Sequence, residues 1–424
     1  MLNNLDLINS NGDGHAVLGD EIAAIEPAFS TATNRDRQLF KYEGDLYAAD
    51  EDSRETLVPV KALYIYNKII NEVPQSTGGS EAAKNSIQAE ALCGRAWTYF
   101  FLINYFGKPY NAATAGSDLG FPLITEADVT KTSFERVSVQ QIYDLMISDL
   151  TKAIPNLTNT GVLWRGRMNK SAAKGILAKV YISMGRFAEA LPLLNESISE
   201  VNGPGAAVTV ALYNYNTALP GFPTTVNDTE NLYSKSVANN LVSTANRLYW
   251  LTPEAAALYD VDDKRLATNY YANMVFPNSL RLIRRTGTSA THFGVRLADL
   301  YLMRAEVKAR LNDLTGAVTD VQFLRQNRLP AAKVAVPTAS ATEKVALIRF
   351  ILDERIREFA AQGYRWYDMR RLSVDPLFTA PTYVHKVYNA AGVVSETFTL
   401  KPERFVFKFS PKIMGENPAL INNP

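Results

Sequence analysis

Two long segments with the apolar periodicity of an α-helix most constrain what this chain can fold into. One covers residues 89–110 and the other residues 351–372, far apart in the sequence. In the first, apolar residues recur at the i, i+3, i+4 and i+7 positions, and Trp97, Tyr99 and Phe101 make the other side apolar as well. A helix that is apolar all round is buried among other elements. The segment therefore predicts a mainly α-helical protein in which this helix is covered on nearly all sides.

Helix ends and paired charges can also be placed in these two segments. Gly107 and Pro109 are expected to stop the first helix, with Gly107 as a left-handed cap. Charged residues of the second segment lie at spacings where opposite charges can pair. Because such pairs are more often structural than catalytic, we expect a structural ion network here. Its predicted members are Glu354, Glu358, Arg365, Asp368 and Arg370.

Helical segments recur in pairs along the chain, as in repeat proteins. Residues 185–191 and 312–318 both look like the turn and second helix of a tetratricopeptide unit. Small residues such as Ala178 and Ala188 let helices approach closely, and each pair must stack on another to bury its apolar face. We predict about four tetratricopeptide-like pairs within a single domain over residues 1–424. The pairs are expected at about residues 57–106, 138–200, 295–328 and 343–372.

Long irregular insertions interrupt these pairs. They are rich in Gly, Pro, Asn, Thr and Tyr, and short alternating runs such as residues 404–409 are candidates for a few short strands. Binding residues usually lie on loops held by a rigid scaffold, so we expect the ligand on this loop-rich face. The insertions cover about residues 108–135, 201–292 and 373–412.

Motifs in chain order resemble those of the SusD/RagB family. Residues 95–109 resemble the family's RA-x-x-YF-x-L-x-x-x-FG-x-P helix, and residues 354–371 resemble its ER-x-x-E…G-x-RW-x-D-x-x-R helix. Residues 169–181 are similar to its second-repeat helix. Residues 296–306 resemble its R-x-AE-x-YL-x-RAE helix, with Asp299 where Glu is usual. Short segments at residues 18–21 and 417–424 also fit, so the resemblance spans almost the whole chain.

The resemblance implies a non-catalytic lipoprotein on the cell surface of a Gram-negative outer membrane. Proteins of this kind bind an oligo- or polysaccharide and deliver it to a SusC-like TonB-dependent transporter. We expect the helical side to dock this partner and the loop side to hold the glycan. The first residues are polar and contain neither a signal peptide nor an acylated cysteine, so membrane association is expected through an N-terminal lipid anchor absent from this chain.

Charge and cysteine content exclude several other classes of protein. The 44 basic and 43 acidic residues leave a net charge of +1, which argues against a nucleic-acid binder or a polybasic membrane-surface protein. The single cysteine, Cys93, permits no internal disulfide and no cysteine-based metal cluster. Because it falls on an apolar helix face, we expect it in the core. No run of about 20 apolar residues could cross a membrane as a helix.

The sequence contains no signature of catalysis or cofactor binding. His15, His292 and His385 are not in a zinc-binding spacing, and no Walker loop, dinucleotide motif or nucleophile elbow occurs. Residues 9–20 have the spacing of a calcium loop, but Asn takes both leading positions and Asp20 the last, where Glu is usual. A turn rich in Gly and Asn explains the same residues. We therefore expect no enzymatic activity, no cofactor and no metal.

Aromatic and amide side chains are the types that a glycan site requires. The apolar face of a pyranose ring stacks on a flat aromatic ring, and the sugar hydroxyls need hydrogen-bond partners. Trp97 and Trp366 lie inside the family-like helices and are expected in the core. The predicted stacking residues are Trp164, Trp250, Tyr249, Tyr213, Tyr215, Tyr270 and Tyr271. The predicted hydroxyl partners are Asn34, Arg35 and Asp36 in the N-terminal loop.

Two alternatives to glycan capture stay open at this point. One is a cytoplasmic tetratricopeptide-type scaffold that binds proteins, which a contiguous concave groove lined by Asn, Lys and Arg would favour. The other is a family member that captures a peptide or glycopeptide instead of a sugar.

Overall fold

A computed structural model describes residues 2–3, 14–159, 165–203, 209–217, 227–238, 248–270, 282–285, 290–379 and 381–424. The described chain is mostly helical with a few short strands, which confirms the predicted fold class. The longer helices are α3 (Arg54–Glu72), α4 (Glu81–Phe106), α5 (Val139–Ala153), α6 (Lys170–Ser183), α7 (Phe187–Glu200), α10 (Leu297–Arg310), α11 (Leu314–Arg325), α13 (Lys344–Phe359) and α14 (Tyr364–Leu372). The shorter helices are α1 (Gly14–Val17), α2 (Asn34–Phe40), α8 (Pro253–Ala256), α9 (Lys264–Asn269), α12 (Thr338–Ala341) and α15 (Pro411–Glu416).

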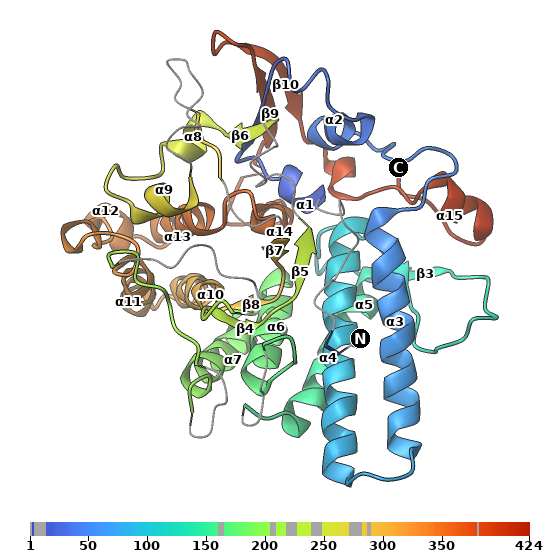
Figure 1. The fold of residues 1–424 in the computed structure, drawn as a ribbon. Helices are drawn as coiled ribbons and strands as arrows, with labels where there is room; N and C mark the ends of the chain where they lie inside the picture. The colour runs from blue at the N-terminus through green and yellow to red at the C-terminus, as the bar shows by residue number, and fades with distance from the viewer. Residues whose placement is uncertain are drawn as a thin grey trace.

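The long helices stack side by side, as the repeat pattern predicts. Figure 1 shows α3 and α4 as an antiparallel pair, and α5 packs along α4. Next come the pairs α6–α7 and α10–α11, with α10 in contact with both α7 and α13. The segment predicted at 138–200 therefore holds three helices, of which α6 and α7 form the hairpin. In this described part of the chain, no helix combines the length and the apolar character needed to cross a membrane.

Helix α4 lies at the centre of the core. Every residue from Ala89 to Phe106 is buried, including Trp97 and Cys93, as its all-round apolar pattern predicts. Its C-terminal end differs from the prediction, because Gly107 has an extended backbone with φ −100° and ψ 154°. The space beside it is tight, since a Cβ atom would lie 2.4 Å from Ile103 Cδ1 unless that side chain moved. A left-handed glycine does precede α14, where Gly363 has φ 84°.

Four strands from distant parts of the chain form the main sheet, in the order β10-β9-β1-β6. Strand β1 pairs antiparallel with β6 and parallel with β9, so the sheet joins the N-terminal segment to two of the insertions. Its strands are β1 (Ile22–Ile25), β6 (Tyr249–Leu251), β9 (Val384–Tyr388) and β10 (Val394–Thr399). Three two-stranded sheets pair β2 (Leu119–Pro122) with β3 (Arg136–Ser138), β4 (Asn231–Tyr233) with β8 (Val295–Arg296), and β5 (Ser236–Ala238) with β7 (Ala290–His292).

The alternating run 404–409 is not a strand, contrary to the prediction. It begins as a 3-10 helix (Pro402–Phe405) and continues without strand pairing. The Phe407 N–H donates to the Tyr105 carbonyl at the end of α4, and the Phe409 N–H donates to the side chain of Asn422. The alternation does bury the three phenylalanines of the run. It was misread as a strand because its backbone partners are a helix end and C-terminal amides.

Candidate functional site

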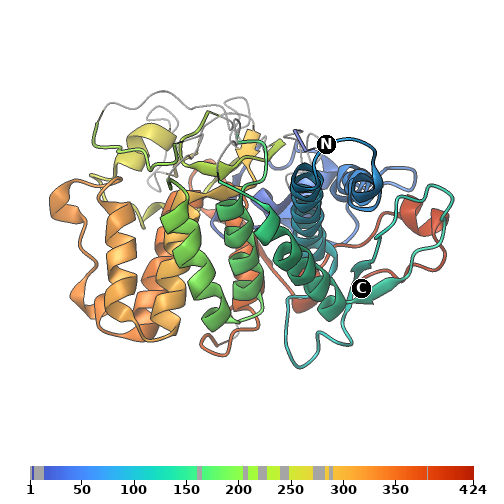
Figure 2. The same ribbon diagram turned by 90° about the horizontal axis from the view of Figure 1, so that it is seen from below.

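The loop-rich face lies over one end of the helix pairs. Figure 2 shows the described segments between α7 and α10 on this face, above α6, α7, α10 and α11. The last turn of α7, the first turn of α10 and the end of α11 meet beneath it. Two features of this face bear on ligand binding. One is a buried network of charged side chains, and the other is a hollow at the surface beside it.

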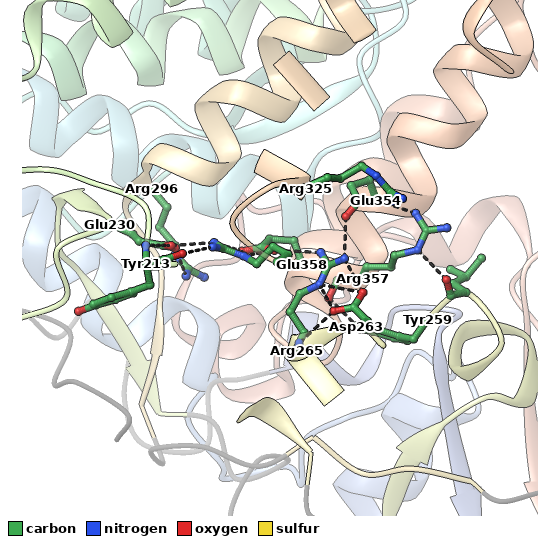
Figure 3. Close-up of polar contacts among 12 residues, drawn as sticks. Tyr213, Glu230, Tyr259, Asp263, Arg265, Arg296, Arg325, Glu354, Arg357 and Glu358 are labelled. Atoms are coloured by element: carbon green, nitrogen blue, oxygen red, sulfur yellow. Dashed lines mark hydrogen bonds and ion pairs between the residues drawn. The ribbon is translucent and has the colours of Figure 1, made fainter. Parts of the chain in front are cut away.

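A buried ion network anchors the large insertion to the helices (Figure 3). Arg265 of α9 contacts Asp263 at 2.7 Å, Glu354 of α13 at 2.8 Å and Glu358 at 3.1 Å. Arg328 joins Glu358, at 2.8 Å, to Glu230 before β4, at 2.7 Å. The other arginines that face these carboxylates are Arg296, Arg325 and Arg357. The network thus ties α9 and β4, both from the insertion, to the scaffold helix α13.

The carboxylates of this network are ionised. Burial raises the pKa of Glu354, but Arg265, Arg357 and Arg325 outweigh burial and lower that pKa to about 2. Burial likewise opposes ionisation of Glu358, yet Arg328 and Arg265 hold its pKa well below the ordinary range. Removing one member of such a set leaves an uncompensated buried charge, which is costly. The network therefore fixes how the loop-rich face sits on the helices.

The ion network predicted from sequence is correct for Glu354 and Glu358 and wrong as a single set. Asp368 instead pairs with Arg355 and Arg371. The two other predicted members, Arg365 and Arg370, also lie outside this network.

Arg365 pairs with Asp20 at 2.6 Å, which gives that residue of the calcium-like segment a structural partner. Arg370 faces no carboxylate among the residues that the structure describes. It donates to Asn104 Oδ1 at 3.1 Å and to the carbonyls of Ile103, Gly107 and Phe405 around the end of α4. Burial lowers the pKa of Arg370 to about 10. Helical spacing could not reveal these partners because they come from distant segments.

The surface hollow lies between α7, α10, α11 and the segment 209–217. We call it the α10–α11 hollow. Its volume is about 300 Å³, and its walls include Asn202, Leu212, Tyr301, Phe323 and Asn327. Pockets of this size that combine apolar walls with a few polar groups are typical of small-ligand sites. Its place at the helix ends puts it on the loop-rich face.

Two aromatic rings form a platform in this hollow. The rings of Tyr301 and Phe323 lie 4.5 Å apart between centroids, inclined by 32°. Phe323 is 40% exposed, and the guanidinium of Arg304 lies 5.3 Å from the Tyr301 ring centroid. Asp320 holds Arg304 in place through two hydrogen bonds of 2.8 and 2.6 Å. Burial raises the pKa of Tyr301, so its hydroxyl is neutral and can donate a hydrogen bond.

Two of the predicted stacking residues lie beside the hollow. The Tyr215 N–H donates to the carbonyl of Asn327 at 2.8 Å, and the Arg328 guanidinium lies 4.4 Å from the Tyr215 ring centroid. The Tyr213 N–H donates to Glu230 Oε1 at 2.9 Å, and its carbonyl accepts from Arg328. Both tyrosines are half-buried. The ion network therefore positions their loop next to the platform.

Three other predicted aromatics are buried. Tyr249 and Trp250 are in β6, where the Tyr249 hydroxyl donates to the Asp36 carbonyl at 3.1 Å and Trp250 packs in a small core cluster. The Tyr270 hydroxyl lies 2.6 Å from that of Tyr259, whose hydroxyl donates to the backbone of α13. A glycan could stack on these rings only after the face rearranged. Their role in binding stays a prediction.

The remaining predicted site residues are placed as follows. Trp164 and Tyr271 lie outside the described residues. Asn34 is exposed at the start of α2, and Asp36 is half-buried there. Arg35 turns inward, where it pairs with the buried carboxylate of Glu55. Of the three predicted hydroxyl partners, Asn34 is thus the most open to a ligand.

Sequence analysis missed the platform because it assigned Tyr301 and Phe323 to the scaffold. The buried side of α11 is carried by Ala317, Val321 and Leu324. Phe323 falls off this stripe, and a large aromatic on the exposed side of an amphipathic helix is a signal that could have identified it.

In the described ranges the three histidines are buried, and the acidic side chains do not gather into a metal-binding cluster. No group of three or more His, Cys, Asp or Glu side chains there is placed to hold a metal ion. Burial lowers the pKa of His15 to about 3, and burial with the nearby Arg296 does the same for His292. His385 stacks between Phe40 and Tyr42. These histidines are neutral core residues, which does not suit them to proton transfer at physiological pH.

Two family profiles match the sequence. The one described as the SusD family matches residues 207–404, and the one described as starch-binding associating with outer membrane matches residues 28–182. A SusD-like protein of Bacteroides ovatus is 34% identical over 123 residues, covering 28% of this chain and 20% of that relative. A SusD-like protein of Formosa agariphila is 23% identical over 404 residues, covering 79% of this chain and 73% of the relative.

Solved structures share the fold over nearly the whole chain. A SusD superfamily protein of Bacteroides thetaiotaomicron has a TM-score of 0.76 at 19% identity, covering 98% of this chain and 95% of the other. A SusD-like carbohydrate binding protein of Bacteroides vulgatus has a TM-score of 0.73 at 16% identity, covering 96% and 90%. At this identity the likeness concerns the architecture.

Proposed function

Since this chain belongs to the SusD family, we propose that it captures a glycan at the surface of the outer membrane. The observation that carries this proposal is the aromatic platform of the α10–α11 hollow, with Phe323 40% exposed beside Tyr301. An open aromatic ring beside a pocket that holds a few polar groups is an arrangement on which a sugar ring can stack. The hollow lies on the loop-rich face, where a ligand is expected.

The chemistry of the hollow suits a sugar. The apolar face of a pyranose ring would stack on Phe323, and ring hydroxyls would reach the Tyr301 hydroxyl and the Asn327 amide at the edge. Tyr215, which is tied to Asn327 through its backbone, would extend the contact surface along the loop. A chain of sugars could therefore lie across the hollow and the neighbouring loop.

We infer binding without hydrolysis. A glycosidase needs two carboxyl groups that flank the scissile bond, about 5–10 Å apart. Among the described residues, the wall of the hollow includes no Asp or Glu. Asp320, which holds Arg304 beside the platform, is engaged by Arg304 and Lys308.

We further propose that the protein hands its glycan to a TonB-dependent transporter of the SusC type. In this arrangement the helical side docks the transporter and the loop-rich face holds the ligand. The single domain over residues 1–424 would be tethered by an N-terminal lipid anchor. Support for this step is the family membership and the segregation of helices and loops to different sides (Figure 2).

The test is a glycan screen followed by calorimetry on two variants. Phe323→Ala is expected to weaken binding of the identified glycan about tenfold, roughly 1.4 kcal/mol, because it removes the exposed half of the platform. Leu311→Ala is the matched control, since Leu311 is 41% exposed but follows the other end of α10. Equal affinity of Phe323→Ala and wild type would place the site elsewhere. Affinity for peptides with none for glycans would overturn the proposed function.

A further inference from the structure

A buried carboxyl group lies where the N-terminal segment meets the scaffold. It belongs to Glu21, which stands between α1 and β1 and is only 2% exposed. Around it, α1 packs against α14, and Asp20 pairs with Arg365 of α14 at 2.6 Å (Figure 1). The Glu21 carbonyl accepts the Thr252 N–H at 2.9 Å, directly after β6 of the large insertion. Glu21 therefore lies at a joint between three parts of the chain.

The side chain of Glu21 binds the turn between α13 and α14. Its Oε1 atom accepts the Ala361 N–H at 3.2 Å, and its Oε2 atom is buried without a hydrogen-bond partner among the described residues. Ala361 has φ 58°, a left-handed conformation that costs free energy for a residue with a Cβ atom. The carboxyl group thus holds a strained turn in place. Gly19 leaves room for it, since a Cβ atom there would lie 1.9 Å from Oε2.

The charged groups that face Glu21 are engaged with other residues. Arg365 donates two hydrogen bonds, of 2.6 and 3.0 Å, to Asp20. Arg355 is paired with two aspartates at 2.7 Å each. The space that these side chains enclose beside Glu21 has no room for a water molecule. The other titratable groups that face this joint are the paired Asp368 of α14 and three neutral side chains, Tyr364 of α14, Tyr42 after α2 and His385 of β9.

Ionisation of Glu21 is therefore costly in the folded protein. A buried charge without a close partner or water loses its hydration, and the neighbouring carboxylate of Asp20 repels it. Burial first, and then Asp20, raises the pKa of Glu21 from 4.5 to about 7. The folded chain thus keeps this proton at mildly acidic pH and loses it as the pH rises through neutrality.

We propose that Glu21 is a proton-dependent latch that fastens the N-terminal segment and the large insertion to the α13–α14 turn. In the closed state the neutral carboxyl group stays buried and binds Ala361. When the proton passes to solvent, residues 18–22 move outward so that water can hydrate the carboxylate. The hydrogen bonds to Ala361 and Thr252 then open together. Because β1 pairs with β6, the support of the loop-rich face loosens with them. The latch does not depend on which ligand the α10–α11 hollow binds.

The first test is the pH dependence of stability. Because the folded-state pKa of Glu21 is raised, its stabilising effect is full below pH 4.5 and is lost as the pH rises to about 7. Relative to Glu21→Gln, the folding equilibrium constant of wild type should fall about a hundredfold between about pH 5 and pH 8. The other titrating groups, such as the buried histidines, are common to both proteins and cancel. Parallel pH profiles would overturn the proposal.

Glu26→Gln is the matched control for this comparison. Glu26 follows the other end of β1, where its carboxylate accepts from the Ser30 hydroxyl at 2.7 Å on the surface. Its removal should leave the pH profile of wild type unchanged. A profile of Glu26→Gln that matches that of Glu21→Gln would overturn the assignment of the latch to Glu21.

A second test reads the latch locally and rests on wild type. The protection of the Ala361 and Thr252 amides against hydrogen exchange should fall at least about tenfold between about pH 6 and pH 8.5. The Leu311 amide, which donates to the Val307 carbonyl at the end of α10, should keep its protection. Unchanged protection of Ala361 and Thr252 would overturn the proposal even if Glu21→Gln failed to fold. In the infrared spectrum at pH 6, wild type should show a protonated carboxyl band that Glu21→Gln lacks, and identical spectra would overturn it too.

Discussion

Replacing Glu354 by Gln is expected to cost about 3 kcal/mol of folding free energy at neutral pH. Glu354 is fully buried and faces Arg265, Arg325 and Arg357 at 2.7–2.8 Å. Burial raises its pKa, but these arginines lower it from 4.5 to about 2. Each pH unit of that difference corresponds to about 1.4 kcal/mol, so the ionised carboxylate stabilises the fold by about 3 kcal/mol. Gln keeps the shape of the side chain and removes the charge.

The cost of this substitution should depend on pH in a defined direction. Because the folded-state pKa of Glu354 is depressed, its stabilisation is complete above the unfolded-state value of 4.5 and is lost as the pH falls towards about 2. The difference between wild type and variant should therefore shrink from about 3 kcal/mol at pH 7 to about half of that near pH 3.

Urea unfolding followed by the fluorescence of the buried Trp97 and Trp366 would measure this difference. Glu72→Gln is the control, because Glu72 pairs with Lys68 on the surface, where an ion pair contributes little. Its unfolding midpoint should match that of wild type at every pH. A cost below about 1 kcal/mol for Glu354→Gln at pH 7, or a cost that does not fall with pH, would refute the electrostatic account.

Two further predictions concern the core. The Cys93 thiol is fully buried, which raises its pKa well above the usual range, so a disulfide reagent should modify it only after denaturation; rapid reaction of the native protein would contradict this burial. Gly363→Ala should lower the free energy of unfolding by more than the roughly 1–3 kcal/mol that backbone strain at φ 84° costs by itself. The added Cβ atom would also lie 1.9 Å from the ring of His15. Gly78→Ala, at φ 77° with open space around it, should show the cost of backbone strain alone in the same urea titration. If both substitutions lowered the free energy of unfolding equally, the contact with His15 would not contribute.

The local sequence pattern predicted those elements whose buried face follows from the spacing of their apolar residues. Helix α4 had to be buried because every side is apolar, and with it Trp97 and Cys93. The same reasoning anticipated that the scaffold segments are helical and that Trp366 packs inside. A helix face repeats every 3.6 residues, so a short stretch of sequence already states which side is covered.

Other features depend on contacts between segments far apart in the chain. Arg370 faces carbonyl groups at the end of α4 instead of a carboxylate, and Glu358 meets Arg265 across 93 residues. The run 404–409 alternates like a strand, yet its backbone partners are a helix end and C-terminal asparagines. No spacing rule in the sequence specifies such partners, because each is chosen by how the layers pack.

The sequence by itself determined the family, the helical scaffold and the need for a loop-rich face. Only the tertiary structure decided where that face is hollow. Tyr301 and Phe323 meet because α10 and α11 pack as a hairpin, while β-sheet pairing buries Tyr249 and Trp250. Periodicity reports which side of an element is covered. Which exposed rings come together depends on the packing of whole helices and strands, and a local pattern does not encode that.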